Sequence, residues 1–239
     1  MTKKTSPTTI SKFLNCPFAY KLKKIDQVAV IEVFEPRRNI GINMHAIIKG
    51  YYTHMTSKPT PKQVEVTATN CFKNLFDESL NEYKREMQVM LNNFIAFEVS
   101  RIPNYRVAEI VEGWVEDDIY GGYVDMFDGI NGYDWKGKSL LKLYDDNLIQ
   151  GKTYERIMKN KGYSQACWNF VGLENGKVLT MPSLADSWLD GKKAIMDNCI
   201  VTGDFPIKKG PLCAWCDVAL ACQYKFKNLW DDILECLTI

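Results

Sequence analysis

The chain has 239 residues, of which 46% are hydrophobic and 25% are charged, and its formal net charge at pH 7 is +1. This composition is ordinary for a folded globular protein and excludes a low-complexity chain. No apolar run approaches the roughly 20 residues of a membrane span, and no apolar segment follows the basic N-terminus as in a secretory signal. We therefore expect an intracellular, cytoplasmic protein without a membrane partner (in the host cell, if the chain is viral).

Helical spacing of apolar residues predicts three helical segments in the first part of the chain. The first is TTISKFLNCPFAY, in which Pro17 stops a short helix. The second is RRNIGINMHAIIKGYYTHM, which contains His45. Residues 62–100 contain neither glycine nor proline and predict one long helix or two abutting helices, which Pro103 ends.

The pattern then changes to strands. Three short segments rich in Val, Ile, Tyr and Trp, separated by Asp-Asp and Asp-Gly turns, predict an antiparallel meander: YRVAEIVEGWVE, IYGGYVDMFDG and INGYDWKGK. Helical spacing returns from Asp146 to Leu173, and KVLTMP predicts a further strand. Residues 183–200 and 214–237 predict the last helices. This order predicts an α/β core with helices added at both ends.

Charge is unevenly distributed along the chain. Residues 1–30 carry six lysines and one acidic residue, whereas residues 109–128 carry seven acidic residues and neither Lys nor Arg. One interpretation is a basic rim that holds phosphate around an acidic pocket that holds a cation. The alternative is two solvated faces of opposite sign.

Two carboxylates and a lysine lie on the predicted second and third strands. Asp134 and Lys136 flank Trp135, so their side chains share one face of the third strand, and Asp125 lies on the second. Carboxylates on adjacent strands can bind one Mg²⁺ or Mn²⁺ ion. Such a site, with a lysine beside it, is typical of metal-assisted phosphodiester hydrolysis. The alternative is an ordinary cross-strand pair on the surface.

Other polar residues are candidates for the same site. His45 could supply a nitrogen ligand, although a lone histidine on a helix is usually structural. Gln165 lies on the helix expected after the meander, where its amide could orient DNA or the lysine. Glu109 or Glu112 could be a further acidic member, or each could simply be a strand residue.

Three of the eight cysteines, Cys213, Cys216 and Cys222, form a C-x2-C-x5-C pattern. In the reducing interior of a cell, spacing this tight favours ligation of a metal or cluster over disulfides.

Taken in order, these residues resemble the PD-(D/E)XK nuclease superfamily, and within it the RecB-like branch. They look most similar to CRISPR-associated iron–sulfur exonucleases and also resemble the nuclease domain of AddB. Six elements follow the family's order over residues 8–222: TTISKFLNCPFAY, GINMH, GYVD, DWK, a glutamine-bearing helix and C-x2-C-x5-C. Each is a weak pattern alone, whereas the ordered set is specific.

The resemblance implies a restriction-endonuclease-like fold, with a mixed sheet flanked by helices and an iron–sulfur cluster joining the N- and C-terminal segments. It implies one nuclease domain over 1–239. Within this domain, 1–105 are helical, 106–182 form the sheet core with the catalytic motif, and 183–239 form a helical part with the cysteine cluster.

The resemblance also implies the ligands of two cofactors. His45, Asp125, Asp134 and the carbonyl of Trp135 would bind Mn²⁺ or Mg²⁺, with Lys136 activating the attacking water and Gln165 supporting the site. A [4Fe-4S] cluster would be held by four cysteines, namely Cys16, Cys213, Cys216 and Cys222. The alternative for these cysteines is a structural zinc ion.

The implied function is a metal-dependent DNA nuclease. It would be an exonuclease that prefers single strands and could also act as an endonuclease. The setting would be CRISPR adaptation, DNA repair or viral genome processing. A helicase or integrase-type protein partner and a homo-oligomer fit the family. The alternative is a weakly active nucleic-acid-binding subunit, because Gly137 and Asn169 stand where the family has a threonine and a tyrosine.

Overall fold

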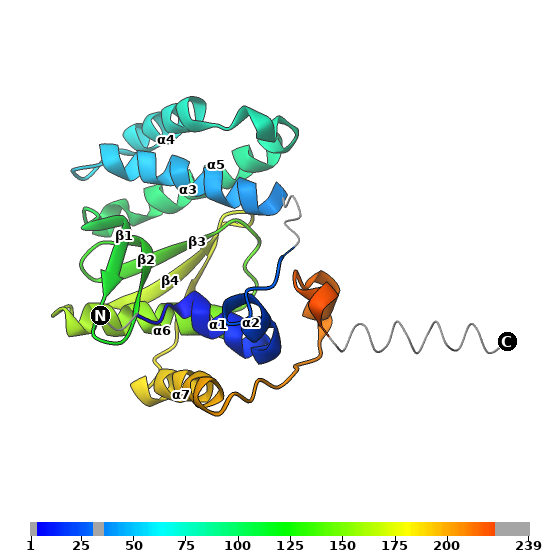
Figure 1. Ribbon diagram of the computed structural model, residues 1–239. Helices are drawn as coiled ribbons and strands as arrows, with labels where there is room; N and C mark the ends of the chain where they lie inside the picture. Colours follow the sequence, from blue (N-terminus) through cyan, green and yellow to red (C-terminus); the bar gives the residue numbers. More distant parts are fainter. Residues whose placement is uncertain (1–3, 31–35, 223–239) are drawn as a thin grey trace. The chain divides into compact units, whose positions relative to one another are not determined.

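The computed structural model describes residues 4–30 and 36–222 (Figure 1). The chain divides into two compact units. The sheet unit comprises Met1–Pro7 and Glu35–Asp186, and the cysteine unit comprises Thr8–Phe34 and Ser187–Ile239. The single nuclease domain expected over 1–239 stays a prediction. None of the helices in the described part is long and apolar enough to cross a membrane.

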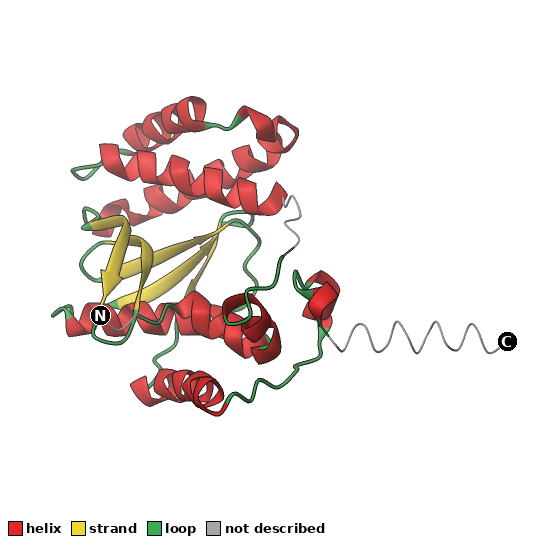
Figure 2. Ribbon diagram, viewed as in Figure 1, coloured by secondary structure: helices red, strands yellow, loops and turns green. Residues whose placement is uncertain are grey.

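The sheet unit is built on a five-stranded sheet with the order β1-β2-β3-β4-β5 (Figure 2). The strands are β1 (Ile110–Glu116), β2 (Gly121–Phe127), β3 (Asn131–Lys136), β4 (Cys167–Gly172) and β5 (Lys177–Thr180). Neighbouring strands are antiparallel except β3 and β4, which are parallel. Helix α6 (Asp145–Asn160) connects these two, as a parallel pair requires a crossover. The expected meander and mixed sheet are therefore confirmed.

The helix expected from Asp146 to Leu173 is wrong in its second half. Helix α6 ends at Asn160, and Gly162 follows with a φ of +100°, a conformation that glycine adopts without strain. The chain then forms β4, which is buried along nearly its whole length. A strand covered on both faces lacks the alternation of polar and apolar residues that identifies a half-exposed strand, so its apolar run resembles a continuing helix.

Three long helices cover one face of the sheet and α6 covers the other (Figure 1). They are α3 (Pro36–His54), α4 (Pro61–Leu75) and α5 (Lys84–Arg101). The region expected as one or two helices contains α4 and α5, joined by a short 3-10 helix η1 (Glu78–Tyr83). Their core includes Tyr52, Phe94 and Trp135, whose rings lie within 6.2 Å of one another by centroid. Trp135 thereby anchors β3 to the helical layer.

A buried ion-pair network lies behind the β2–β3 turn. The carboxylate of Glu98, which has no exposed surface, accepts hydrogen bonds from Arg101 at 2.6 Å and from the Tyr52 hydroxyl at 2.7 Å. Arg101 also donates to Asp128 at 3.1 Å, and Asp128 accepts the backbone N–H groups of the turn. The network therefore fixes the turn that joins the two strands.

A four-residue loop, Asp117 to Tyr120, joins β1 to β2. Its first residue organises it, because Asp117 Oδ1 accepts the backbone N–H groups of Ile119 at 2.8 Å and Tyr120 at 2.7 Å. Backbone pairing then runs from Glu116↔Gly121 to Ile110↔Phe127 without a slip.

The cysteine unit contains α1 (Pro7–Asn15), α2 (Pro17–Lys24) and α7 (Asp186–Thr202), followed by the 3-10 helices η3 (Pro211–Trp215) and η4 (Ala219–Ala221). The first helix ends before Cys16, as expected, but a second helix starts at once, because proline is well accommodated in a first helical turn. A small core of Phe13, Met196 and Phe205 packs α1 against α7. Of the helix expected at 214–237, the described part forms only 3-10 turns, and residues 223–237 lie outside the described chain.

Candidate active site

Three carboxylates from three strands meet in one row of the sheet. The β1–β2 pairing places Glu112 opposite Asp125, between Val111↔Met126 and Gly113↔Val124. The β2–β3 pairing ends at Met126↔Tyr133, so Asp125 and Asp134 occupy the next position along the two strands. There the Asp125 carboxylate accepts the N–H of Trp135 at 2.8 Å.

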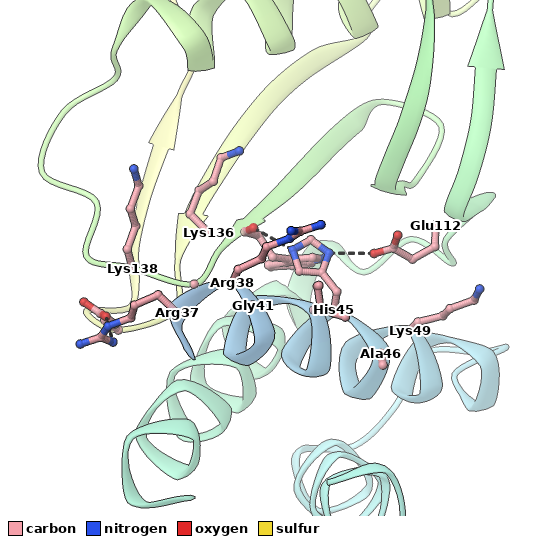
Figure 3. A pocket seen from close by; sticks show the side chains of 13 residues that line it. Arg37, Arg38, Gly41, His45, Ala46, Lys49, Glu112, Lys136 and Lys138 are labelled. Carbon is pink, nitrogen blue, oxygen red and sulfur yellow. Dashed lines mark hydrogen bonds and ion pairs between the residues drawn. The ribbon is translucent and has the colours of Figure 1, made fainter. Parts of the chain in front are cut away.

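His45 reaches this row from the middle of α3 (Figure 3). Its Nδ1 lies 2.9 Å from Oε1 of Glu112 and 3.7 Å from Oδ2 of Asp125, and its Nε2 lies 3.1 Å from the carbonyl oxygen of Trp135. One ligand atom each of His45, Glu112 and Asp125 lies within 4.8 Å of the other two, a spacing that can hold one metal ion. Either Glu109 or Glu112 was a candidate for a further acidic residue of the site. The structure brings Glu112 to the site, whereas Glu109 accepts a hydrogen bond from the Tyr163 hydroxyl.

The three carboxylates of this row place negative charge close together in a partly buried site. Burial, followed by repulsion from Asp134, raises the pKa of Asp125 well above its usual range. Burial lowers the pKa of His45, but its hydrogen bond with Glu112 and the nearby carboxylates outweigh burial and raise the pKa to about 9. The raised pKa of His45 shows that the carboxylates favour positive charge at this place, which a divalent cation would also supply.

Two further observations fit a bound cation. Asp134 is 3% exposed, and its Oδ2 forms an ion pair with Lys136 Nζ at 2.6 Å. The remaining lone pairs of this buried carboxylate could coordinate a cation. Glu112 has a φ of +46°, in the left-handed region that residues other than glycine seldom adopt. Backbone strain of this kind concentrates at functional sites.

A glutamine links Lys136 to Asp134, and it is Gln150 on α6. Its Oε1 accepts a hydrogen bond from Lys136 Nζ at 2.8 Å, and its Nε2 donates to Asp134 Oδ1 at 2.5 Å. Tyr154, one turn later and hydrogen-bonded with Gln150, is 4% exposed, and burial raises its pKa. Lys136 is therefore held in place from two sides.

The expected placement of Gln165 on a helix is wrong. Gln165 is exposed in a turn that leads into β4. β4 starts opposite Asn131, the first residue of β3, whereas Lys136 is the last. Gln165 therefore lies toward the opposite end of the strand from the carboxylates. The spacing Gln-x3-Tyr of Gln150 and Tyr154 was the sequence signal that could have pointed to the glutamine that contacts Lys136 and Asp134.

A basic cavity of about 960 Å³ adjoins the carboxylates (Figure 3). It is lined by the exposed side of α3, by Glu112 and by the end of β3. Arg37 lines it too but pairs with Glu86 and Glu174. No ion pair within the described residues holds its other exposed cations: Arg38, Lys49 and Lys138. The positive charge that lines this cavity comes from α3 and from the residues that follow β3.

The four expected cluster ligands share one cavity of the cysteine unit. Cys16, Cys213, Cys216 and Cys222 are free, half-buried and line a space of about 240 Å³. Four thiols from two distant parts of the sequence suit a cluster or a metal ion.

Comparison with known proteins agrees with this geometry. A sequence model described as the PD-(D/E)XK nuclease superfamily matches residues 4–223. The crystal structure of a candidate exonuclease from Eubacterium rectale is similar, with a TM-score of 0.54 and 12% identity, and covers 89% of this chain and 86% of its own. At this identity the similarity shows a shared fold. No curated protein matches the sequence.

Proposed function

The chain belongs to the PD-(D/E)XK nuclease superfamily, and we propose on that basis that it is a Mn²⁺- or Mg²⁺-dependent deoxyribonuclease of the RecB-like branch, a single-strand-preferring exonuclease. The observation that carries the proposal is the carboxylate row beside a lysine that Gln150 holds in place. Superfamily membership implies a nucleic-acid substrate, and the basic cavity beside the row supports this.

In the proposed mechanism, the cation would be held by His45, Asp125, Asp134 and the Trp135 carbonyl, with Glu112 as an added ligand. The cation would supply Lewis acidity toward the scissile phosphate. Lys136 orients the attacking water through its ammonium group and offsets the negative charge that grows on the phosphate. Gln150 keeps the side chains of Lys136 and Asp134 in fixed positions while the substrate binds.

The cavity explains how the strand would be held. Arg38 and Lys49 on α3 and Lys138 beyond β3 present three cations without ion-pair partners in the described chain. Each would contact a phosphate without regard to base identity. Binding should therefore weaken steeply as salt rises.

We also propose that Cys16, Cys213, Cys216 and Cys222 hold a [4Fe-4S] cluster, which would join the start of the chain to residues near 220. The shared cavity supports this assignment. Iron and acid-labile sulfide should be present in anaerobically purified protein and be lost in Cys216→Ser. Stoichiometric zinc without iron would contradict the cluster.

The alternative of a weakly active binding subunit rested on two unusual residues, Gly137 and Asn169, and the second no longer supports it. Asn169 is a buried β4 residue bonded to Thr180 and to the Gly132 carbonyl, whereas Tyr154 holds the position one turn after the glutamine. Gly137 alone remains as a departure. A helicase or integrase-type partner and homo-oligomerisation stay predictions.

The decisive experiment is cleavage of end-labelled single-stranded and duplex DNA in Mn²⁺, Mg²⁺ or EDTA. Lys136→Ala should lower the cleavage rate by about 100-fold or more, since groups of this kind contribute roughly 10²–10⁴-fold, and EDTA should abolish cleavage. Lys161→Ala, which removes an exposed lysine after α6, is the matched control. Binding to DNA without cleavage by the metal-loaded parent would favour the binding subunit.

A further inference from the structure

Two large aromatic side chains are exposed together on the β1–β2 hairpin. Trp114 is 49% exposed and Tyr123 is 62% exposed, and they face each other across the two strands. Their ring centroids are 5.2 Å apart at an interplanar angle of 71°, an edge-to-face contact. Aromatic rings of this size usually lie in a core or an interface, so this pair needs a reason to face solvent.

The indole of Trp114 is held in one orientation. Its Nε1–H donates to Oε2 of Glu116 at 2.7 Å. A Cβ at position 121 would lie 2.7 Å from Cζ2 of the indole, so Gly121 leaves the space that the ring occupies against β2. A ring fixed in advance loses little conformational freedom when a flat partner stacks on it.

The pair is continuous with the proposed metal site. Trp114 lies two residues after Glu112 on β1, and Tyr123 lies two residues before Asp125 on β2. Two residues of a strand span about 7 Å. A strand with one phosphate at the carboxylates could therefore bring a neighbouring nucleotide to the two rings.

The charge around the rings disfavours the phosphate of that nucleotide more than its base. Glu116, Asp117 and Asp118 follow directly on the same hairpin. Of the cations nearby, Arg156 of α6 lies 4.0 Å from Asp117, and Lys4 lies beside Gly121, so the carboxylates outnumber the cations. These carboxylates disfavour a phosphate at the rings. An uncharged nucleobase has no such penalty, and base–aromatic stacking tolerates any base because every base has a π face.

We propose that Trp114 and Tyr123 form a stacking platform for one nucleobase of the strand being cut. The proposal rests on the proposed nuclease function and deepens it. A base inside a duplex is already stacked on both faces and must leave the duplex to reach the rings, so the platform favours single strands and unpaired ends over the interior of duplex DNA.

The test measures binding of fluorescein-labelled single-stranded DNA by anisotropy in EDTA, and cleavage in Mn²⁺. Trp114→Ala should weaken single-strand binding by roughly 5- to 150-fold, the range that loss of one stacked base corresponds to, and Trp114→Phe should restore most of it. Ile119→Ala removes an exposed apolar side chain from the same hairpin and should have no effect.

A scan with single abasic nucleotides locates the base. One abasic position should weaken binding of the parent protein as much as Trp114→Ala does, and should cause no further loss in that variant. Unchanged binding by the correctly folded variant, or equal abasic losses in the parent and the variant, would overturn the platform. If the parent neither binds nor cuts DNA, the nuclease proposal itself fails instead.

Discussion

Gln150→Ala tests whether the glutamine of α6 organises the proposed catalytic lysine. The change removes the acceptor of the Lys136 ammonium at 2.8 Å and the donor to Asp134 at 2.5 Å. A hydrogen bond to a charged group contributes about 1.5–3 kcal/mol. Water can replace part of this in a half-buried site, so we expect the net loss to resemble that of one such bond. This corresponds to a 10- to 100-fold lower kcat/KM, the usual cost of losing a group that orients metal ligands.

The assay is single-turnover and steady-state cleavage of single-stranded DNA in Mn²⁺, together with Mn²⁺ affinity from titration of the activity. Gln165→Ala is the matched control, because that side chain is exposed in the turn before β4, and it should retain full activity. A Gln150→Ala enzyme within threefold of the parent would refute the assigned role of α6. So would an equal loss in Gln165→Ala.

Two further variants test the surroundings of the site. Tyr154→Phe keeps the ring but loses the hydroxyl that bonds with Gln150, so kcat/KM should fall only about 2- to 12-fold; a loss as large as that of Gln150→Ala would show a direct role of the hydroxyl. Arg101→Met leaves the buried carboxylates of Glu98 and Asp128 uncompensated and should lower the free energy of unfolding by about 3–5 kcal/mol, or the melting temperature by about 6–20 °C. Circular dichroism measures this change, exposed Arg106→Ala is the control, and an unchanged melting temperature would contradict the network.

Alternation along the strands predicted how two of the three carboxylates lie, whereas Glu112 was left open as an ordinary strand residue. Asp125 and Asp134 were expected on adjacent strands with Lys136 on the same face as Asp134, and the structure places the three together with His45. The reason is that side-chain direction in a strand follows from local geometry alone. The roles assigned to these residues stay proposals.

Features that depend on burial were not predictable in the same way. β4 resembled a continuing helix because both of its faces are covered, and this error placed Gln165 on an expected helix. The pairing of Arg101 with Asp128 has no local signal, since it joins α5 to a turn 27 residues away, whereas Glu98 and Arg101 are spaced i,i+3 on one helix. The left-handed backbone of Glu112 likewise follows from its surroundings and not from its identity.

The loop from Asp117 to Tyr120 has a consequence for how sequences of this kind can diverge. Surface loops usually accept insertions and deletions at little cost. Here the loop sets which residue of β1 faces Asp125, and a shift of the pairing by one residue would turn Glu112 away and bring a neighbour in its place. The same shift would separate Trp114 from Tyr123. A length change in these four residues would therefore act as an active-site mutation, although it would lie at the far end of the hairpin.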